Sequence, residues 1–512
     1  MVDGQQPPNR PPIAGGEWMM DTDRGVTILF SVVVYMGICI AVGLWALRRT
    51  RSSADFFMAG RNLGVIVTGF AVFSSIMSGF GFVGGPGLVY HMGMSSLWMV
   101  ISAPMGTCIS FYLLGKRIRL LAELKESVSL PDVVAARYKS RLTRLLTSLA
   151  ILLGVMGYLG TQILAMATVL QDIIANTPIG RLSLEACVTV SFAVLVFYCV
   201  TGGIIASVYT DVIQGFIMVI AALLVLVAAT TAVPDGFAGM SLTIGADDPE
   251  AISPWGSVGM LGCLSWYFLF TLGASGQPHV ITKLMMSKRV GDVRRTLPIS
   301  VVGYSLTALL WLGIGLAMRT LVLSGSHPEL PGIDAAAPQF LQAYTHPLLA
   351  GLVFAALFAA IMSTADGFLN IGSAAIVHDI PQSLRGRSLK NELLWARTAT
   401  VVIALVASLI AVYSGDLVAI LGAFGWGTFA AALVPVVTIG FNWKRATSLA
   451  ANTAMISSLA INLGVKLLKV RIPFRIDAGA IALLVSLTLF FGISLLSKPR
   501  KLDPDVDRVM DL

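Results

Sequence analysis

A short run of hydroxyl and carboxyl side chains interrupts one of the most apolar parts of this sequence. The run consists of Ser363, Thr364 and Asp366. On an α-helix, Ser363 and Thr364 share one face with Ala360 and Gly367, because residues three, four and seven positions apart point the same way. Hydroxyl and carbonyl oxygens on one face are hard ligands of the kind that hold small cations such as Na⁺. The alternative is that both hydroxyls bond to carbonyl groups one turn earlier, and the spacing alone favours neither interpretation.

Two carboxyl groups are expected deep in an apolar environment. Asp366 belongs to the run described above, and Asp211 lies at the start of the apolar stretch 208–232. A carboxylate inside a bilayer is costly, so such groups are usually paired, protonated or bound to a cation. We therefore predict a second cation site or a proton site at these two residues. For Asp211 the alternative is a helix cap at the membrane surface.

Glycine and proline break two of the apolar stretches. In 64–90 the sequence Gly-Phe-Gly-Phe-Val-Gly-Gly-Pro-Gly starts at Gly79, and in 257–285 the sequence Gly-Ala-Ser-Gly-Gln-Pro-His starts at Gly273. Such residues weaken the helical ladder and free backbone carbonyls, which a membrane tolerates only where protein or water satisfies them. Small residues also line ordinary helix contacts. Two such breaks, each at the start of a block of five helices, favour inverted repeats with a solute site at the midplane.

The composition places the chain in a membrane. Of the 512 residues, 56% are hydrophobic and 12% are charged, and the mean hydropathy is +0.83. A soluble protein carries about 25% charged residues. Since a membrane helix needs about 20 apolar residues, the sequence predicts an all-α polytopic membrane protein with thirteen transmembrane helices. The spans lie near 26–47, 64–90, 94–115, 143–172, 185–204, 208–232, 257–285, 297–322, 345–380, 394–414, 417–440, 447–468 and 475–497. Together they form a transporter domain at 26–497, with repeats at about 64–232 and 257–440.

The distribution of positive charge predicts the orientation. With the N-terminus outside and the C-terminus inside, most of the 35 Lys and Arg residues fall on the cytoplasmic side, for example in 116–144 and 283–295, as the positive-inside rule requires. The basic loop 466–475 is an exception that this rule does not explain. We expect the proline-rich segment 1–25 to be a disordered external tail, and 498–512 to be a cytoplasmic tail.

Other residue types exclude several functions. The five cysteines lie scattered in apolar stretches, without the paired spacing of a zinc site or a disulfide framework, and the five histidines form no metal-type cluster in the sequence. Motifs of nucleotide-binding proteins, zinc proteases and serine hydrolases are missing, so we predict that the protein is not an enzyme. The net charge of +8 fits loops that face anionic lipid. It does not indicate nucleic acid, since no basic stretch is interleaved with stacking aromatic residues.

Five strings of residues resemble the sodium:solute symporter family, which includes carriers of proline, pantothenate, monocarboxylates, sialic acid and glucose. The strings are Asp55–Gly64, Ser127–Asp132 with Arg137-Tyr138, Thr201–Gly203 with Tyr209–Gln214, Gly276–His279 and Met362–Asp366. The resemblance implies a LeuT-like core of two inverted five-helix repeats and a Na⁺ gradient that drives solute uptake. It also implies a sodium ion between the first broken helix and the eighth core helix. Its ligands would be the carbonyls of Ser74, Met77 and Ala360 and the hydroxyls of Ser363 and Thr364.

Two departures from the family pattern limit what the resemblance implies. Some members build a second sodium site at the position of Asp211 with two hydroxyls, but the matching positions are Asp366 and Gly367. Two carboxylates hold a cation or share a proton, and both alternatives stay open. Proline carriers have an acidic residue where this chain has Ile76. The Gly-Gln-Pro-His string is nevertheless similar to that of proline-type members, and it implies a small amino acid or carboxylate as the solute. The residues expected near this solute are Ser78, Gly79, Trp266, Tyr267 and Gln277.

The sequence therefore predicts a Na⁺-coupled secondary active symporter that imports a small organic solute by alternating access. The alternatives are a carrier coupled to H⁺, a sugar symporter, and a membrane sensor that binds solute without transporting it. Its partners would be the small-molecule substrate, Na⁺ and the lipid bilayer, with no nucleic acid and no predicted oligomeric state. The family resemblance implies a multi-pass protein of a cell membrane, with a bacterial inner membrane as the expected location.

Overall fold

The computed structural model describes residues 22–47, 53–59, 62–413, 418–498 and 501–512. Most of the predicted external tail, residues 1–21, lies outside this description, as do Gly60 and Arg61 of the first resemblance string. The first helix, α1 (Thr22–Leu47), begins slightly before the predicted start at 26.

The described residues form α-helices joined by short 3-10 and π-helical segments. The remaining α-helices are α2 (Ser53–Met58), α3 (Val65–Ile76), α4 (Gly85–Met92), α5 (Leu97–Ser110), α6 (Lys116–Leu124), α7 (Leu130–Tyr138), α8 (Arg141–Ala175), α9 (Leu184–Ala232), α10 (Gly236–Asp247), α11 (Met260–Gly273), α12 (Pro278–Met285), α13 (Asp292–Leu323), α14 (Ala336–Tyr344), α15 (Pro347–Ala374), α16 (Ile380–Arg385), α17 (Glu392–Tyr413), α18 (Val418–Leu433), α19 (Ser448–Leu467), α20 (Ala478–Leu496) and α21 (Pro504–Met510). Four other segments matter below: η2 (Phe80–Gly84), η7 (Ala274–Gly276), η9 (Ala375–Asp379) and η10 (Val434–Ile439).

Within the described residues, ten helical segments are long and apolar enough to cross a membrane. They are Asp23–Val42, Phe80–Leu124, Arg141–Ala175, Ser207–Ala232, Asp292–Leu323, Pro347–Arg385, Glu392–Tyr413, Leu421–Ile439, Ser448–Leu467 and Ala478–Leu496. Nine of them coincide with one predicted span each, and Phe80–Leu124 covers the span 94–115 together with the end of the span 64–90. The predicted spans at 64–90, 185–204 and 257–285 have no long helix of their own, so the count of thirteen stays a prediction. Two of these three are the stretches that glycine and proline break.

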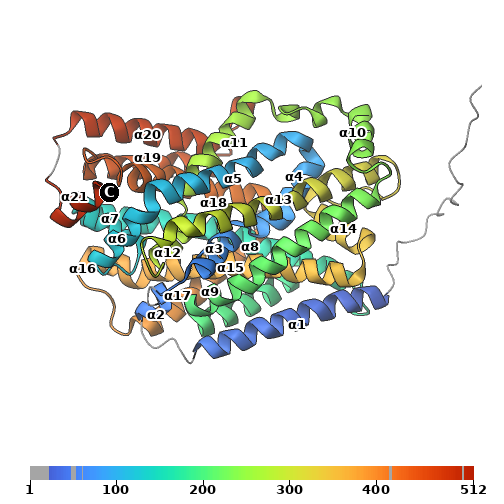
Figure 1. The fold of residues 1–512 in the computed structure, drawn as a ribbon, viewed down its shortest axis with the longest axis horizontal. Helices are drawn as coiled ribbons and strands as arrows, with labels where there is room; N and C mark the ends of the chain where they lie inside the picture. Colours follow the sequence, from blue (N-terminus) through green and yellow to red (C-terminus); the bar gives the residue numbers. More distant parts are fainter. Residues whose placement is uncertain (1–21, 48–52, 60–61, 414–417, 499–500) are drawn as a thin grey trace, which may run out of the picture.

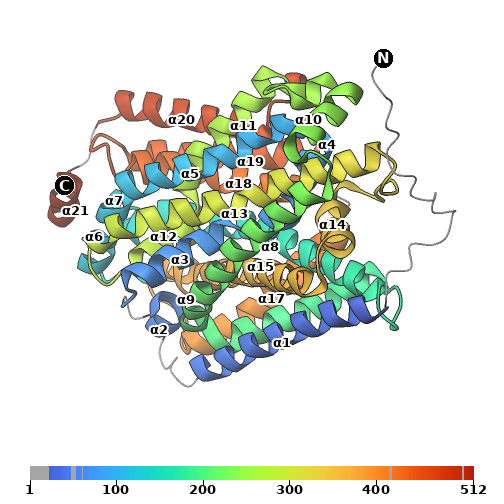
Figure 2. The same cartoon turned by 45° about the vertical axis from the view of Figure 1, so that its right-hand side comes forward.

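The long helices run side by side, and short helices cover the two ends of the bundle (Figures 1 and 2). The short helices α2, α6, α7, α16 and α21 gather at one end in Figure 1, whereas α10 and α14 lie at the other. All five helices of the first group fall in segments predicted to be cytoplasmic. The structure thus brings these segments to a common end of the molecule, and the side of the membrane that this end faces stays a prediction.

Helix α9 turns back on itself. The hydroxyl oxygens of Tyr198 and Thr210, 12 residues apart in the chain, lie 2.7 Å from each other. Twelve residues of straight α-helix would separate their backbones by about 18 Å. The two arms of α9 therefore correspond to the predicted fifth and sixth spans, which the sequence separates by very few residues.

Both broken helices are interrupted as predicted. Helix α3 ends at Ile76, and the backbone of Met77 is extended (φ −82°, ψ 99°) before η2 begins. Helix α11 ends at Gly273 and passes through η7 to Gln277, which is extended (φ −75°, ψ 110°) ahead of α12. We call residues 77–79 the first break and residues 274–277 the second break.

The helices that carry the candidate site are the central ones. In α15 and its continuation, 83% of the membrane-spanning window is buried inside the protein, and in α8 the figure is 78%. In α1 it is only 28%, so this helix packs on the outside of the bundle. The polar residues of α15 consequently face protein and not lipid.

Candidate functional site

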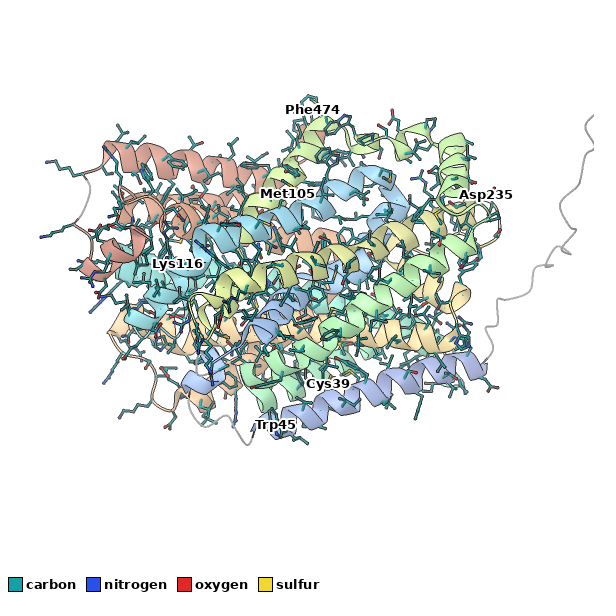
Figure 3. The ribbon with its side chains drawn as sticks, viewed as in Figure 1. Cys39, Trp45, Met105, Lys116, Asp235 and Phe474 are labelled. Atoms are coloured by element: carbon teal, nitrogen blue, oxygen red, sulfur yellow. The ribbon has the colours of Figure 1, made fainter. Side chains whose placement is uncertain are left out.

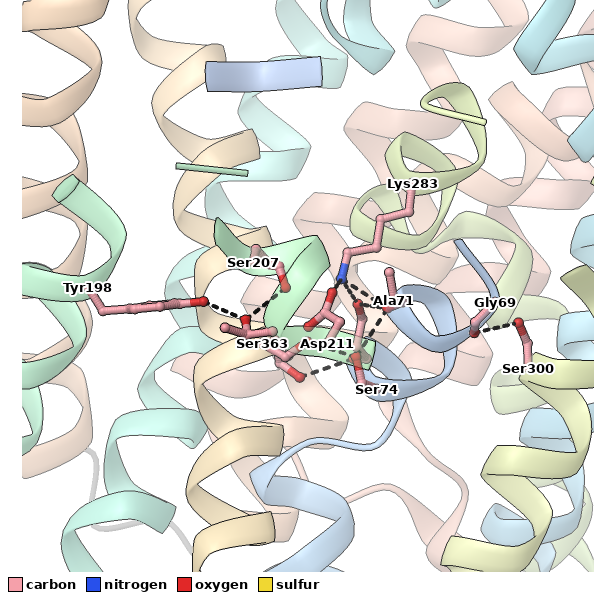
Figure 4. A network of polar contacts seen from close by, with 12 residues as sticks. Gly69, Ala71, Ser74, Tyr198, Ser207, Asp211, Lys283, Ser300 and Ser363 are labelled. Atoms are coloured by element: carbon pink, nitrogen blue, oxygen red, sulfur yellow. Dashed lines mark hydrogen bonds and ion pairs between the residues drawn. The ribbon is translucent and has the colours of Figure 1, made fainter. Parts of the chain in front are cut away.

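At the first break, two hydroxyl groups of α15 reach across to α3. The hydroxyl oxygens of Ser363 and Ser74 are 3.0 Å apart, and the Thr364 hydroxyl donates to the carbonyl of Ser75 over 3.1 Å. Figure 4 shows Ser363 and Ser74 meeting between the two helices. These contacts exclude the alternative that both hydroxyls bond to carbonyl groups one turn earlier in α15, and the cation site stays a prediction. Both hydroxyls point into the space between α15 and α3, and neither is satisfied by its own helix.

The first break explains why a carbonyl of α3 is available. In a continuous helix the amide of Gly79 would donate to the carbonyl of Ser75. It donates instead to Oε1 of Gln162 in α8, over 2.8 Å. The carbonyl of Ser75 is thereby left for Thr364. Neither Ser75 nor Gln162 was predicted from the sequence, although Gln162 is one of only two glutamines in the apolar span 143–172 and was a usable signal.

The five predicted sodium ligands are all buried. Ser74, Met77, Ala360 and Thr364 have no exposed surface, and Ser363 has 1%. The structure joins the hydroxyls of Ser363 and Ser74 and brings the Thr364 hydroxyl to the carbonyl of Ser75. Met77 lies at the break and Ala360 lies one turn before Ser363 and Thr364 on α15, and the roles of the Ser74, Met77 and Ala360 carbonyls stay predictions. Several hydroxyl and carbonyl oxygens in a water-poor space are a suitable donor set for a small hard cation.

A buried lysine lies beside these ligands. The ammonium of Lys283 in α12 is 2.9 Å from Oδ2 of Asp211 and 2.9 Å from the carbonyl of Ala71, and it also bonds the hydroxyl of Ser75. Figure 4 shows Lys283 reaching down to Asp211 and Ala71. Sequence analysis placed Lys283 in the basic cytoplasmic segment 283–295, but its side chain is fully buried. The signal for this partner was Asp211 itself, because a carboxylate in a membrane needs a counter-charge.

The two acidic residues have different surroundings. Asp211 has no exposed surface, so the alternative of a cap at the membrane surface is wrong. Its Oδ1, like Oδ2 of Asp366, has no hydrogen-bond partner among the described residues. A cation or a proton would satisfy either oxygen. Lys283 already neutralises Asp211, so a second cation bound there would have to compete with the ammonium.

The predicted solute residues divide into two groups. Ser78, Gly79 and Gln277 lie at the two breaks and are buried. The hydroxyl of Ser78 is 3.1 Å from that of Tyr158, and Nε2 of Gln277 donates to the carbonyl of Gly273 over 3.0 Å. Oε1 of Gln277 is a buried acceptor without a partner among the described residues.

Trp266 and Tyr267 point in different directions, as neighbours on a helix must. Trp266 lines a cavity of about 230 Å³ together with residues of α4, α18, α19 and α20. The hydroxyl of Tyr267 donates to Sδ of Met105 over 3.0 Å, and its ring packs edge-on against Trp98 in α5. Met105, labelled in Figure 3, is exposed, with 49% of its surface accessible. The structure therefore does not bring Tyr267 together with the other predicted solute residues.

Aromatic rings that sequence analysis did not single out surround the space between the breaks. Trp426 of α18 lies 5.3 Å from the ring of Phe270 and 6.5 Å from that of Tyr158, and Phe80 stacks on Phe270 at 6.1 Å. Nε1 of Trp426 is buried without a partner among the described residues. A Cβ atom on Gly273 would come within 2.7 Å of this nitrogen. Aromatic residues are frequent in membrane spans, so nothing in the sequence distinguishes these rings from others.

Comparisons with known proteins agree with the resemblance found in the sequence. The model of the "Sodium:solute symporter family" matches residues 56–458. A sodium/proline symporter of Escherichia coli is 29% identical over 443 residues, which cover 84% of this chain and 86% of the relative. An osmoregulated proline transporter of Bacillus subtilis is 27% identical over 446 residues, which cover 85% and 88% of the two chains.

Solved structures of similar fold are transporters. A Na⁺-coupled sialic acid symporter in a substrate-bound, outward-open state superimposes with a TM-score of 0.75 at 20% identity, over 94% of this chain and all of the other. A nucleobase-cation-symport-1 family transporter in a closed conformation gives a TM-score of 0.55 at 15% identity, over 89% and 98% of the two chains. At this level of identity the likeness concerns the fold, which is the LeuT-like fold that the sequence predicts.

Proposed function

The chain belongs to the sodium:solute symporter family, and from this premise we propose that it imports a small amino acid, with proline as the first candidate, together with Na⁺. Family membership makes the protein a multi-pass membrane transporter, not an enzyme, and makes Na⁺ its coupling ion. The finer assignments are the solute, the ligands of the ion, the orientation and the number of spans. They rest on the arguments that follow.

The sodium site lies at the first break. Its supporting observation is the pair of contacts that join α15 to α3, from Ser363 to Ser74 and from Thr364 to the carbonyl of Ser75. An ion bound between these helices replaces hydroxyl-to-oxygen contacts with stronger ion-to-oxygen contacts. It therefore stabilises the state in which α3 and α15 lie together. A ligand shifts a conformational equilibrium only by its different affinity for the two states, and this arrangement provides such a difference.

The solute lies between the two breaks. Nε1 of Trp426 is a buried donor and Oε1 of Gln277 is a buried acceptor. The two side chains both approach Gly273, Trp426 through its Nε1 and Gln277 through its Nε2. A zwitterion matches this pair, because its carboxylate accepts from the indole and its ammonium donates to the amide oxygen. The rings of Phe80 and Phe270 provide an apolar wall for a small ring such as that of proline. The names of the relatives support the same class of solute.

Transport follows the alternating-access scheme of inverted repeats. Na⁺ binding favours a state open to the outside, solute binding permits closure, and one repeat then rocks against the other. The N-terminus lies outside and the protein has thirteen spans, as the charge pattern and the span order support. A bacterial cell membrane is the expected location, since the relatives named above are bacterial.

Uptake into proteoliposomes tests this function. The full chain is reconstituted, and accumulation of labelled proline, other amino acids, monocarboxylates and sugars is measured with and without an inward Na⁺ gradient. We expect accumulation of proline or another small amino acid only with the gradient. Accumulation driven by a proton gradient alone would contradict Na⁺ coupling and would favour Asp211 and Asp366 as proton sites. Solute binding without accumulation under any gradient would favour the sensor.

A further inference from the structure

A second buried polar cluster lies far from both breaks, at the end of the bundle where α7 and α16 lie. Nε2 of His378 is 3.1 Å from Oδ2 of Asp132. One ligand atom from each of Asp132, His378 and Asp379 lies within 4.8 Å of the other two. Sequence analysis predicted that the histidines form no metal-type cluster. That prediction is wrong for His378, because the two carboxylates come from α7, more than two hundred residues earlier, and from the adjacent residue in η9.

Each of the three side chains is fixed by an outer partner that leaves one atom facing the cluster. Nδ1 of His378 lies 3.0 Å from a carboxylate oxygen of Glu392, so Nε2 faces Asp132. An imidazole that binds a metal usually donates its other nitrogen to a carboxylate in this way. The guanidinium of Arg144 lies 3.2 Å from Oδ1 of Asp132, which leaves Oδ2 toward His378.

Asp379 supplies an independent observation. The hydroxyl of Ser129 donates to its Oδ1 over 2.5 Å, whereas its Oδ2 has no partner among the described residues. The side chain is almost completely enclosed, with 1% of its surface exposed. An unpaired carboxylate oxygen in such a position is costly, and a bound cation removes the cost.

We propose that Asp132, His378 and Asp379 form a binding site for a divalent transition-metal ion of the zinc type. One imidazole nitrogen and two carboxylate oxygens are ligands that zinc accepts in sites with an open fourth position. The side chains of Asp132 and His378 border a cavity of about 540 Å³, which gives water access to that position and provides an entry path. The cluster holds three carboxylates, those of Asp132, Asp379 and Glu392. Arg144 pairs with Asp132, and each nitrogen of the His378 ring lies against a carboxylate, so a divalent ion would bind at Nε2 in place of a proton and add positive charge to the group.

The outer wall of this cavity has the opposite charge. Lys139 and Arg141 line it, together with Lys125, which is paired with Asp503 and Asp505 of the C-terminal segment. This wall repels a cation that approaches through the cavity. Salt screens such repulsion between exposed charges, so raising the ionic strength should speed zinc binding and not slow it.

The site links three elements that are distant in the sequence. It joins α7 to the end of α15 through η9, and Glu392 connects it to the start of α17. A metal that binds only the folded protein stabilises it by mass action. Zinc should therefore raise the unfolding temperature of the wild-type protein, and it should not raise that of a variant without the ligands.

Calorimetric titration of the purified, metal-stripped full chain with Zn²⁺ tests the site. We expect one equivalent bound by the wild type, and at least ~10-fold weaker binding for His378→Ala and for Asp379→Asn. The matched controls His91→Ala and Asp235→Asn change exposed residues, and we expect them to bind zinc as the wild type does. The proposal is overturned if the wild type binds no zinc at submillimolar concentration, or if both ligand variants bind it unchanged.

A second measurement on the unaltered protein guards against variants that fail to fold. Co²⁺ in a site with four or five ligands gives strong visible absorption, and we expect the wild-type protein to develop these bands and to lose them when zinc is added. The variant His378→Cys keeps a metal ligand at this position and should retain the bands at shifted wavelengths. A weak spectrum like that of aqueous Co²⁺ for the wild type would overturn the assignment.

Discussion

The two broken helices begin the two predicted repeats, yet their polar groups find different partners. At the first break and in the part of α3 just before it, the partners come from three other helices: Gln162 of α8, Lys283 of α12 and Thr364 of α15. The backbone groups of this region are therefore held by a network that includes a buried ion pair. Such a network is sensitive to the loss of any member, because the remaining groups stay buried.

At the second break the partners are mostly local. Nε2 of Gln277 bonds the carbonyl of Gly273, and the hydroxyl of Ser275 bonds that of Leu272. Among the residues that the structure describes, only Thr438 of η10 reaches in from another helix, to the carbonyl and hydroxyl of Ser275. In the proposed function, the first break supplies charge and hard oxygens for the ion, whereas the second supplies the amide oxygen of Gln277 for the solute.

Of the changes at the two breaks, the loss of the Ser363 and Thr364 hydroxyls should reduce transport most. In Ser363→Ala plus Thr364→Ala we expect Na⁺-driven uptake to fall by about 100-fold or more, because each lost contact to a charged ligand costs about 1.5–3 kcal/mol. The initial rate of uptake as a function of Na⁺ concentration measures the effect. Uptake with unchanged Na⁺ dependence would remove the sodium site from the first break.

The ion pair beside the site should be the next most sensitive feature. In Lys283→Met, Asp211 stays buried without its counter-charge, and we expect the free energy of unfolding to fall by about 3–5 kcal/mol. The double variant Asp211→Asn plus Lys283→Met should recover most of this loss, since no unpaired charge remains. Denaturant titration in detergent measures both. If the double variant loses as much unfolding free energy as Lys283→Met and Asp211→Asn lose together when measured singly, the two residues are not coupled.

A substitution at the second break should weaken binding of the solute and leave binding of Na⁺ unchanged. In Trp426→Phe the ring stays and the donor is lost, so we expect the KM for the solute to rise about 10-fold while the half-saturating Na⁺ concentration stays the same. Trp255→Phe is the matched control, because Trp255 stacks on Trp98 away from both breaks. A change in Na⁺ affinity without a change in KM would reverse the proposed division.

The smallest effect is expected at Thr438. Replacing it by Val removes one hydroxyl that joins η10 to Ser275. A neutral hydrogen bond of this kind contributes about 1 kcal/mol, so stability should fall by about that amount and uptake should change only a few-fold. A loss of uptake as large as that of the Ser363 and Thr364 variant would mean that the two breaks do not differ in function.

Much of the fold could be predicted from the sequence because a membrane leaves few solutions. The lengths of the apolar stretches located the spans, and clustered glycine and proline located both breaks. Both signals are reliable because an unsatisfied backbone group in a bilayer costs several kcal/mol of free energy. The two arms of α9 were predicted as separate spans, although very few residues separate them in the sequence. The spacing of Ser363 and Thr364 also predicted that both face the same side.

The partners of these residues could not be predicted in the same way. Lys283 resembled a loop lysine because it follows the Gly-Gln-Pro-His string within a basic segment, and only the turn of α12 carries it inward to Asp211. The contact between Gln162 and Gly79 joins residues 83 positions apart. Neither hydropathy nor spacing specifies such a pairing. The same holds for Asp132 and His378, whose meeting depends on the packing of α7 against the end of α15.

Equilibrium binding of radioactive Na⁺ to the purified protein tests the central claim most directly, because it needs no knowledge of the solute. Three forms are compared: the wild type, Ser363→Ala plus Thr364→Ala, and Ser275→Ala plus Thr438→Val. We predict that the wild type and the variant at the second break bind Na⁺ with similar affinity, and that the variant at the first break does not bind it measurably. Undiminished Na⁺ binding by the Ser363 and Thr364 variant would contradict the account.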